Sequence, residues 1–132
     1  MSMPETPHAP AGALILVVDD ERKNRQLIEV LLGADGYRVQ CATSGEEALV
    51  MIAAEPPDLV LLDVMMPGVD GYRIATKLKG NPVTTHIPVV MVSALDDRNS
   101  RTHALNVGAA EFITKPVNQA TLKSVVRTLL GR

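Results

Sequence analysis

Four short apolar runs in the sequence each end at residues that can do chemistry. The runs and the residues that follow them are Leu14–Val18 with Asp19 and Asp20, Leu59–Leu62 with Asp63, Val89–Val92 with Ser93, and Phe112–Thr114 with Lys115. An apolar run without polar alternation is typical of a strand buried on both faces, as in a parallel sheet covered by helices. If the four strands are parallel, their carboxyl ends bring these polar side chains to one edge of the sheet, where open parallel sheets bind ligands.

These side chains together predict a metal-dependent phosphoryl-transfer site. Each taken alone could be a helix cap or a solvated loop residue, but their recurrence at four successive strand ends favours a shared site. Neighbouring carboxylates cannot all stay ionised unless positive charge compensates them, and Lys115 supplies one such charge. Mg²⁺ suits a site of a few carboxylates, a backbone carbonyl, waters and phosphate oxygens. Such a site favours phosphoryl transfer, in which Asp63 would be the nucleophile and would form an aspartyl phosphate.

The alternation of predicted strands and helices specifies the fold class. Strands are predicted at residues 14–18, 37–42, 59–62, 89–92 and 111–114, and helices at 21–34, after Ser44, after Asp70, at 98–107 and from Asn118. Strand and helix alternate five times, which indicates an α/β three-layer sandwich with a five-stranded parallel sheet, and right-handed crossovers favour a doubly wound arrangement. Two doubly wound strand orders are common, and the order 2-1-3-4-5 would bring Asp19, Asp20 and Asp63 together.

Local patterns predict how two of these helices are held. Residues at helical spacing predict the inner face of the first helix: Asn24, Leu27, Leu31 and Ala34. The fourth helix has a polar first half and few evident core anchors, which are Ala104, Leu105 and Val107. We therefore expect the fourth helix to be the least firmly held of the five.

Length and composition exclude several classes of protein. The 132 residues fit one domain, expected at residues 13–132, after a proline-containing leader at residues 1–12 that is expected to be disordered. Charged residues make up 21% of the chain, and a net charge of −2 gives no electrostatic basis for direct nucleic-acid binding. The sequence has no secretory signal and no apolar stretch near the roughly 20 residues that span a bilayer. We expect a cytoplasmic protein that does not enter the membrane.

The cysteine and the histidines do not extend the predicted site. Cys41 is the only cysteine, so the chain can form neither a disulfide framework nor a thiolate metal site, and Cys41 is expected in the core. His8, His86 and His103 have no partner at metal-ligand spacing. They are expected on the solvated surface.

The sequence resembles the receiver domain of two-component response regulators from about Leu14 to Leu130. The motifs that carry the resemblance are V-V-D-D-E at 17–21, L-L-D-V-M-M-P-G-V-D-G at 61–71, V-S-A at 92–94 and T-K-P at 114–116, in the order and spacing of that family. The resemblance implies a flavodoxin-like, receiver-type sheet in the order 2-1-3-4-5, which the alternation of elements alone leaves open.

The resemblance also implies roles for the acidic residues. Asp63 would be the phosphoacceptor, which takes a phosphoryl group from a phosphohistidine on a sensor histidine kinase or phosphotransfer protein. Asp20, Asp63 and the backbone carbonyl of Met65 would ligate Mg²⁺, and Asp19 would act mainly through bound water. The protein would then be a signalling domain that catalyses only its own phosphorylation and dephosphorylation.

Further roles follow from the same resemblance. Ser93 and Lys115 would bind phosphoryl oxygens, and the Lys115–Pro116 peptide bond would be cis. Phe112 matches the aromatic switch residue of the family, which turns inward when the hydroxyl at the Ser93 position moves toward the phosphate; otherwise it is a plain core phenylalanine. An output domain or partner protein would bind through residues 98–130.

Other functions remain open at this point. A flavodoxin-like nucleotide binder would need a phosphate-cradling loop after the first strand, where this sequence has D-D-E. A Mg²⁺-dependent phosphatase could use the same carboxylates, and an interaction module that never becomes phosphorylated would not need the complete acidic set. The sequence names neither the kinase nor the output, although the H-I-P-V-V and A-L-D-D-R stretches resemble receivers attached to cyclic-dinucleotide enzymes.

Overall fold

Strands and helices alternate along the whole described chain. The computed structural model describes residues 12–66, 71–94 and 98–131. The strands are β1 (Leu14–Val18), β2 (Arg38–Ala42), β3 (Leu59–Asp63), β4 (Val89–Ser93) and β5 (Glu111–Thr114). The helices are α1 (Arg22–Gly33), α2 (Gly45–Ala54), α3 (Gly71–Lys79), α4 (Arg98–Asn106) and α5 (Gln119–Leu129). The predicted leader and the predicted cap Asp70 lie outside the described residues, apart from Gly12.

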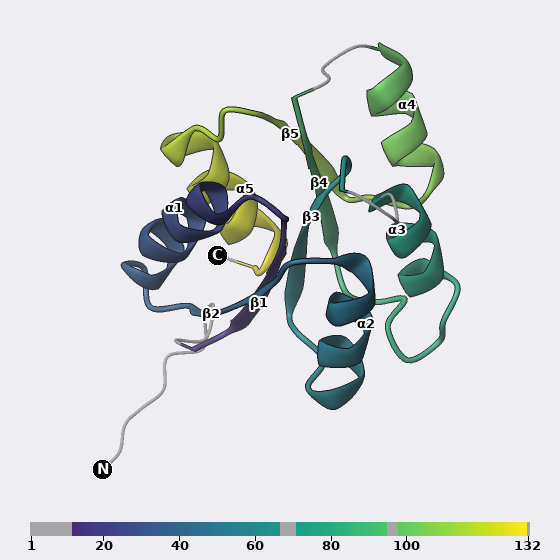
Figure 1. Cartoon of the computed structure of the whole chain (residues 1–132), viewed down its shortest axis with the longest axis horizontal. Coiled ribbons are helices and arrows are strands. Elements are labelled where there is room, and N and C mark those ends of the chain that lie inside the picture. The colour runs from purple at the N-terminus through teal and green to yellow at the C-terminus, as the bar shows by residue number, and fades with distance from the viewer. Residues whose placement is uncertain (1–11, 67–70, 95–97, 132) are drawn as a thin grey trace.

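The strands form one parallel sheet in the order β2-β1-β3-β4-β5 (Figure 1). This confirms the predicted fold class and strand order. The strand order reverses between β1 and β3, and Val18 lies opposite Leu62 in the register of these two strands. The residues that follow, Asp19 and Asp63, therefore emerge side by side at the carboxyl edge of the sheet.

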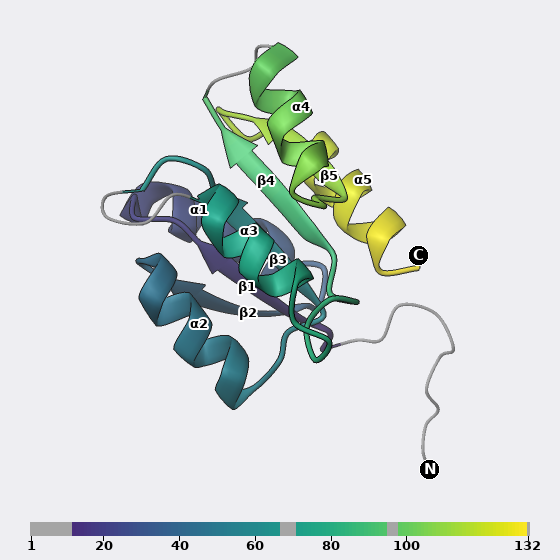
Figure 2. The same cartoon turned by 90° about the vertical axis from the view of Figure 1, so that its right-hand side faces the viewer.

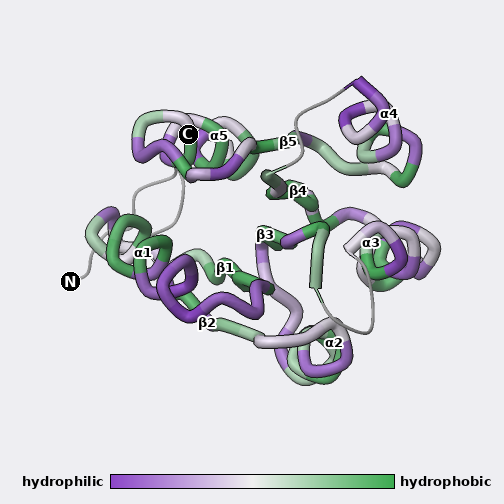
Figure 3. Tube along the Cα trace, turned by 45° about the horizontal axis from the view of Figure 1, so that its top comes forward, coloured by the Kyte–Doolittle hydropathy of each residue, from purple (hydrophilic) through white to green (hydrophobic). Residues whose placement is uncertain are grey.

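Helices cover both faces of the sheet. α1 and α5 pack on one face, and α2, α3 and α4 pack on the other (Figure 2). All residues of β1, β3 and β4 are buried, and these strands lie between the two helical layers (Figure 3). Because alternate side chains of a strand point to opposite faces, each central strand contributes to two separate cores. This explains why these strands are continuous apolar runs in the sequence.

The inner face of α1 differs from the predicted one. Ile28 and Leu32 are the buried residues of this helix, whereas Leu27 is 43% exposed. The helix is apolar at Leu27, Ile28, Val30, Leu31 and Leu32. The sequence therefore allows two neighbouring apolar faces with helical spacing. Packing against β1 and α5 determines which of the two is buried.

The helix α4 is held by little buried surface, as predicted. Ala104 is its one buried residue, whereas α1, α2, α3 and α5 each bury two or more. Leu105, a predicted anchor, is instead 69% exposed. Val107 packs against the core just beyond the end of the helix. None of the helices in the described part of the chain has the length and apolar character that a membrane crossing requires.

Two substitutions on α1 test which of its faces is buried. Ile28→Ala should lower the free energy of unfolding by about 2–5 kcal/mol, because it removes methyl groups from a closed core. Leu27→Ala, one position away on the exposed side, should cost about 1 kcal/mol or less. Urea denaturation of both variants measures the difference. Equal losses, or a larger loss for Leu27→Ala, would contradict the packing described here.

Candidate functional site

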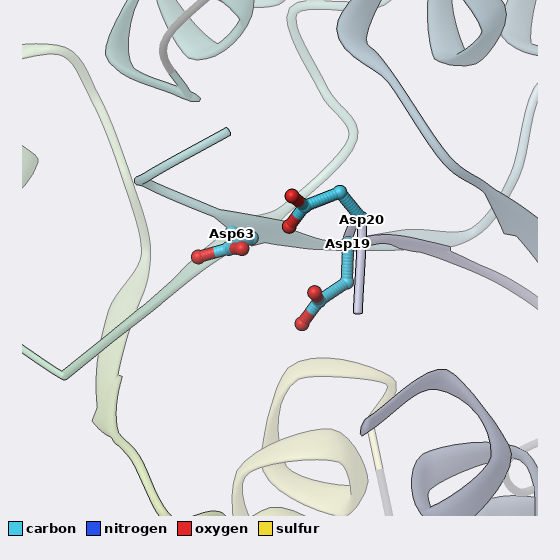
Figure 4. A group of neighbouring side chains, drawn as sticks. All are labelled: Asp19, Asp20 and Asp63. Carbon is cyan, nitrogen blue, oxygen red and sulfur yellow. The ribbon is translucent and has the colours of Figure 1, made fainter. Parts of the chain in front are cut away.

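Three carboxylates meet at the carboxyl edge of the sheet. Asp19 and Asp20 directly follow β1, and Asp63 is the last residue of β3 (Figure 4). One carboxylate oxygen from each lies within 4.8 Å of the others. Asp19 and Asp63 are buried, at 2% and 3% exposure, whereas Asp20 faces solvent. The structure thus brings together the three acidic residues that the sequence predicted to be neighbours.

Asp19 is held by several hydrogen bonds. Its Oδ1 accepts from the backbone N–H of Glu21 at 2.8 Å, and its Oδ2 accepts from the side-chain amide of Asn24. The guanidinium of Arg25 donates to the backbone carbonyl of Asp19 at 2.8 Å. Both side chains come from the first turn of α1. The start of this helix therefore fixes the orientation of the Asp19 carboxylate.

Asn24 and Arg25 were not predicted as site residues. Asn24 was instead assigned to the inner face of α1 by its spacing. The sequence did contain a signal for them. Both are polar residues with donor groups, and they lie in the first turn of the helix that follows β1 and the acid at its end. Asn24 satisfies the buried carboxylate, which is costly to leave without partners, and Arg25 holds the backbone carbonyl of the same residue.

Lys115 lies between two of the carboxylates. Its Nζ is 3.3 Å from Oδ2 of Asp19 and 3.4 Å from Oδ2 of Asp63. Partial burial alone would lower the pKa of Lys115, but the charges of Asp63 and Asp19 outweigh it, and the pKa is raised. The side chain is therefore a cation at neutral pH. The Lys115–Pro116 peptide bond is cis, as the resemblance implied.

Asp63 is an unusually basic carboxylate. Burial and, next, the charge of Asp19 raise its pKa to about 6, although the ammonium of Lys115 and the N–H of Met65 oppose the shift. Oδ1 accepts the Met65 N–H at 3.2 Å, while Oδ2 faces Lys115. One ammonium thus compensates part of the charge of three carboxylates, and the remainder favours a bound cation.

Ser93 and Phe112 lie on the strands beyond β3. Ser93 ends β4, is fully buried, and is opposite Thr114 in the register with β5. The Lys115 N–H donates to the Ser93 carbonyl at 2.9 Å, so Ser93 at the end of β4 and Lys115 just after β5 lie at the same edge as Asp63. Phe112 is half-buried and packs against the core on the α4 side of the sheet.

Gly71, the first residue of α3, packs directly against the Asp63 backbone. Its N–H donates to the Val64 carbonyl at 2.9 Å. A Cβ atom built at Gly71 would lie 2.4 Å from the Asp63 carbonyl oxygen, a distance that no side chain tolerates. Glycine is therefore required for α3 to begin this close to the site.

Sequence comparison relates the chain to known proteins. Residues 15–127 match the response regulator receiver domain family. The chain belongs to this family. The match covers the whole sheet apart from Leu14 and contains every residue of the candidate site.

Individual relatives support the same assignment of this receiver. It is 50% identical over 118 residues to the response regulator PleD of Caulobacter vibrioides, covering 89% of the chain and 26% of that relative. It is 37% identical to the phosphate regulon transcriptional regulatory protein PhoB of Pseudomonas aeruginosa, covering 92% of the chain and 53% of PhoB. The receiver thus spans about a quarter to a half of these curated relatives.

Solved structures of other receivers share the fold. A putative response regulator from Chloroflexus aurantiacus superimposes with a TM-score of 0.88 at 33% identity, covering 92% of this chain and 99% of that one. The chemotaxis protein CheY4 of Vibrio cholerae gives 0.85 at 28% identity, covering 90% and 99%. A receiver, and not a phosphatase or a nucleotide binder, is the function class that these comparisons support.

The pKa of Asp63 predicts how stability depends on pH without divalent cations. The folded state holds the Asp63 proton up to about pH 6, whereas the ordinary value is 3.8. Stability from this group is therefore present below about pH 4 and is lost as the pH rises toward 6. Asp63→Asn should remove that loss, so that its stability relative to wild type grows by up to about 3 kcal/mol between these pH values.

Urea unfolding in EDTA at several pH values measures this difference. Glu46→Gln, which neutralises an exposed carboxylate in the first turn of α2, serves as the control and should follow the wild type. A constant difference between Asp63→Asn and wild type across the pH range would show that Asp63 titrates normally.

Gly71→Ala should damage the site as well as the fold. Because the added methyl group collides with the Asp63 carbonyl, the backbone must shift, at a cost of about 1–3 kcal/mol. Gly33→Ala is the matched control: nothing lies within 4 Å of a Cβ at that helical position, so alanine should be neutral or stabilising. Thermal denaturation compares the two variants, and equal stability would contradict the close approach.

Proposed function

We propose that this receiver accepts a phosphoryl group on Asp63 from a phosphohistidine of a sensor histidine kinase or phosphotransfer protein. The observation that supports this assignment is the placement of Asp63 at the end of β3, where its carboxylate is buried beside Lys115 and the two acids that follow β1. An Asp63 oxygen would form the new bond to phosphorus as the N–P bond breaks. The imidazole would leave with the bonding electrons and take up a proton from solvent.

We assign the phosphoryl-binding roles to Lys115 and Ser93. Lys115 already faces Oδ2 of Asp63 and would pair with a phosphoryl oxygen added there. Ser93 ends the neighbouring strand, and its hydroxyl would bond a second oxygen. Both groups would stabilise the charge that develops during transfer, which is the main contribution of a protein to this reaction.

The acidic residues fit a Mg²⁺ ion. Asp20 has an exposed carboxylate with no hydrogen bond or ion pair to the described residues, so it is available as a direct ligand with Asp63 and the Met65 carbonyl. Both oxygens of Asp19 already accept hydrogen bonds or face Lys115, which supports an indirect role through water. When bound, Mg²⁺ would neutralise the charge that repels an incoming phosphoryl group.

The response to phosphorylation would reach partners through residues 98–130. Phe112 would act as the switch, because it is half-buried on the strand next to Ser93. A pocket of about 250 Å³ between α4 and β5 is lined by Phe112 and by Leu105, which is 69% exposed. An output domain or partner protein would use this surface.

Replacing the acceptor tests the proposed function. Asp63→Asn should abolish labelling by acetyl phosphate with Mg²⁺, because the amide keeps the shape of the side chain but is not a nucleophile. Intact-mass spectrometry detects the added phosphoryl group. Asp58→Asn, just before the opposite end of β3, is the matched control and should be labelled like wild type. Labelling of Asp63→Asn at the wild-type rate would place the acceptor elsewhere.

Removing one acid tests the proposed metal site. Mg²⁺ at about a hundred times its dissociation constant should stabilise the wild type by roughly 2.7 kcal/mol. For a domain of this size that is about 8–16 °C in the unfolding midpoint. Asp20→Asn should stabilise the metal-free protein and reduce the Mg²⁺ shift, since it removes both a repulsion and a ligand.

Thermal unfolding with and without Mg²⁺, at matched ionic strength, makes this measurement. Asp35→Asn removes a carboxylate that pairs with Lys123 outside the cluster and should leave the Mg²⁺ shift intact. A full Mg²⁺ shift in Asp20→Asn, with lower metal-free stability, would show that the three acids do not form one metal site.

A further inference from the structure

The helix α4 is held mainly by contacts with its two neighbours rather than by the core. Ala104 is its one buried residue. On one side, the guanidinium of Arg101 lies over the ring of Phe112 at 4.9 Å and donates to the Thr114 hydroxyl at 3.3 Å. On the other side lies α3, beside α4 in Figures 1 and 3. The position of α4 therefore depends on its side-chain contacts with α3 and β5.

The Tyr72 side chain connects α3 to α4. Its hydroxyl donates to the Ser100 carbonyl at 3.2 Å. Its ring stacks on His103, with ring centroids 3.8 Å apart and an angle of 14° between the planes. Ser100 and His103 are one turn apart on the same face of α4. His103 was expected to be a solvated residue, but one face of its ring is covered by Tyr72.

Tyr72 is also next to the residue that touches the Asp63 backbone. Gly71 leaves no room for a methyl group between α3 and the Asp63 carbonyl, and its N–H is bonded to the Val64 carbonyl. The Met65 N–H in turn donates to Oδ1 of Asp63. A group added at Oδ2 turns the carboxylate into an acyl group, so Oδ1 loses its share of the negative charge and becomes a weaker acceptor for that N–H. The resulting shift of the backbone would press directly on the start of α3.

We propose that Tyr72 is a positioning residue that transmits changes at Asp63 to α4. This rests on the proposed phosphorylation of Asp63. The route runs from the Asp63 backbone through Gly71 to Tyr72 and reaches α4 from the α3 side. The Phe112 side chain reaches α4 from the opposite side, through Arg101. Both neighbours of α4 are thus connected to the site, so the helix moves when either contact changes.

Hydrogen exchange with and without beryllofluoride and Mg²⁺ tests this role. Beryllofluoride stands in for the phosphoryl group on Asp63. In the wild type, exchange in residues 98–107 should change when it binds. In Tyr72→Leu, which loses both the stack and the hydrogen bond, the change should fall to about half or less, because one of two couplings is removed. Tyr72→Phe keeps the stack and should give an intermediate change.

Two further variants keep the test decisive. His103→Ala removes the stack from the exposed α4 side, where folding is not at risk, and should reproduce most of the Tyr72→Leu effect. Thr76→Ala alters the next turn of α3, where the hydroxyl bonds the Tyr72 carbonyl within the helix, and should respond like wild type.

Fluorine NMR of bound beryllofluoride distinguishes a failure of the Tyr72 role from a failure of the proposed function. If it binds every variant and α4 responds equally in wild type, Tyr72→Leu and His103→Ala, the role of Tyr72 is wrong and the proposed function stands. If it does not bind the wild type with Mg²⁺, the proposed function fails and this inference fails with it. Binding to all variants, with the response reduced to about half or less in Tyr72→Leu and reduced likewise in His103→Ala, supports the route.

Discussion

The ammonium of Lys115 lies between the buried carboxylates of Asp19 and Asp63, and this arrangement of charges constrains most of the structure. Two acids shielded from water repel each other, and burial makes ionisation of either one costly. The sheet order supplies the geometry, because it makes β1 and β3 neighbours and brings the end of β5 to the same edge. In the first turn of α1, Asn24 donates to the Asp19 carboxylate and Arg25 donates to the Asp19 backbone carbonyl.

Burying these carboxylates together lowers the stability of the fold, but it places Asp63 for the proposed reaction. The raised pKa of Asp63 means that the folded, metal-free protein resists ionisation of the residue that would have to be ionised to react. A well-packed apolar side chain at that position would be more stable but could not react. The strain is tolerable because the three central strands are buried along their whole length, which gives the domain a continuous core on both faces of the sheet.

Much of the fold and the acidic site could be predicted because they depend on local patterns. Buried strands ending in acids are visible in the sequence, and the edge where parallel strands end is fixed by geometry. The strand order needed the resemblance, since the alternation of elements fits more than one doubly wound order. The inner face of α1 and the contact of Tyr72 with His103 could not be predicted. Leu27 and Ile28 have equal apolar character, and a tyrosine does not specify which helix lies across from it.

The sparse burial of α4 has a consequence for how such a domain can diverge. Because Ala104 is its one buried residue, substitutions at the outward-facing positions of this helix leave the packing of the sheet intact. Side chains such as Leu105, which face outward, can then change the shape and charge of the surface without a penalty in core packing. With partners bound at this helix, as proposed above, the same scaffold and acidic site would be kept while those partners are exchanged. Selection for a new partner would act first on the helix that contributes least to folding.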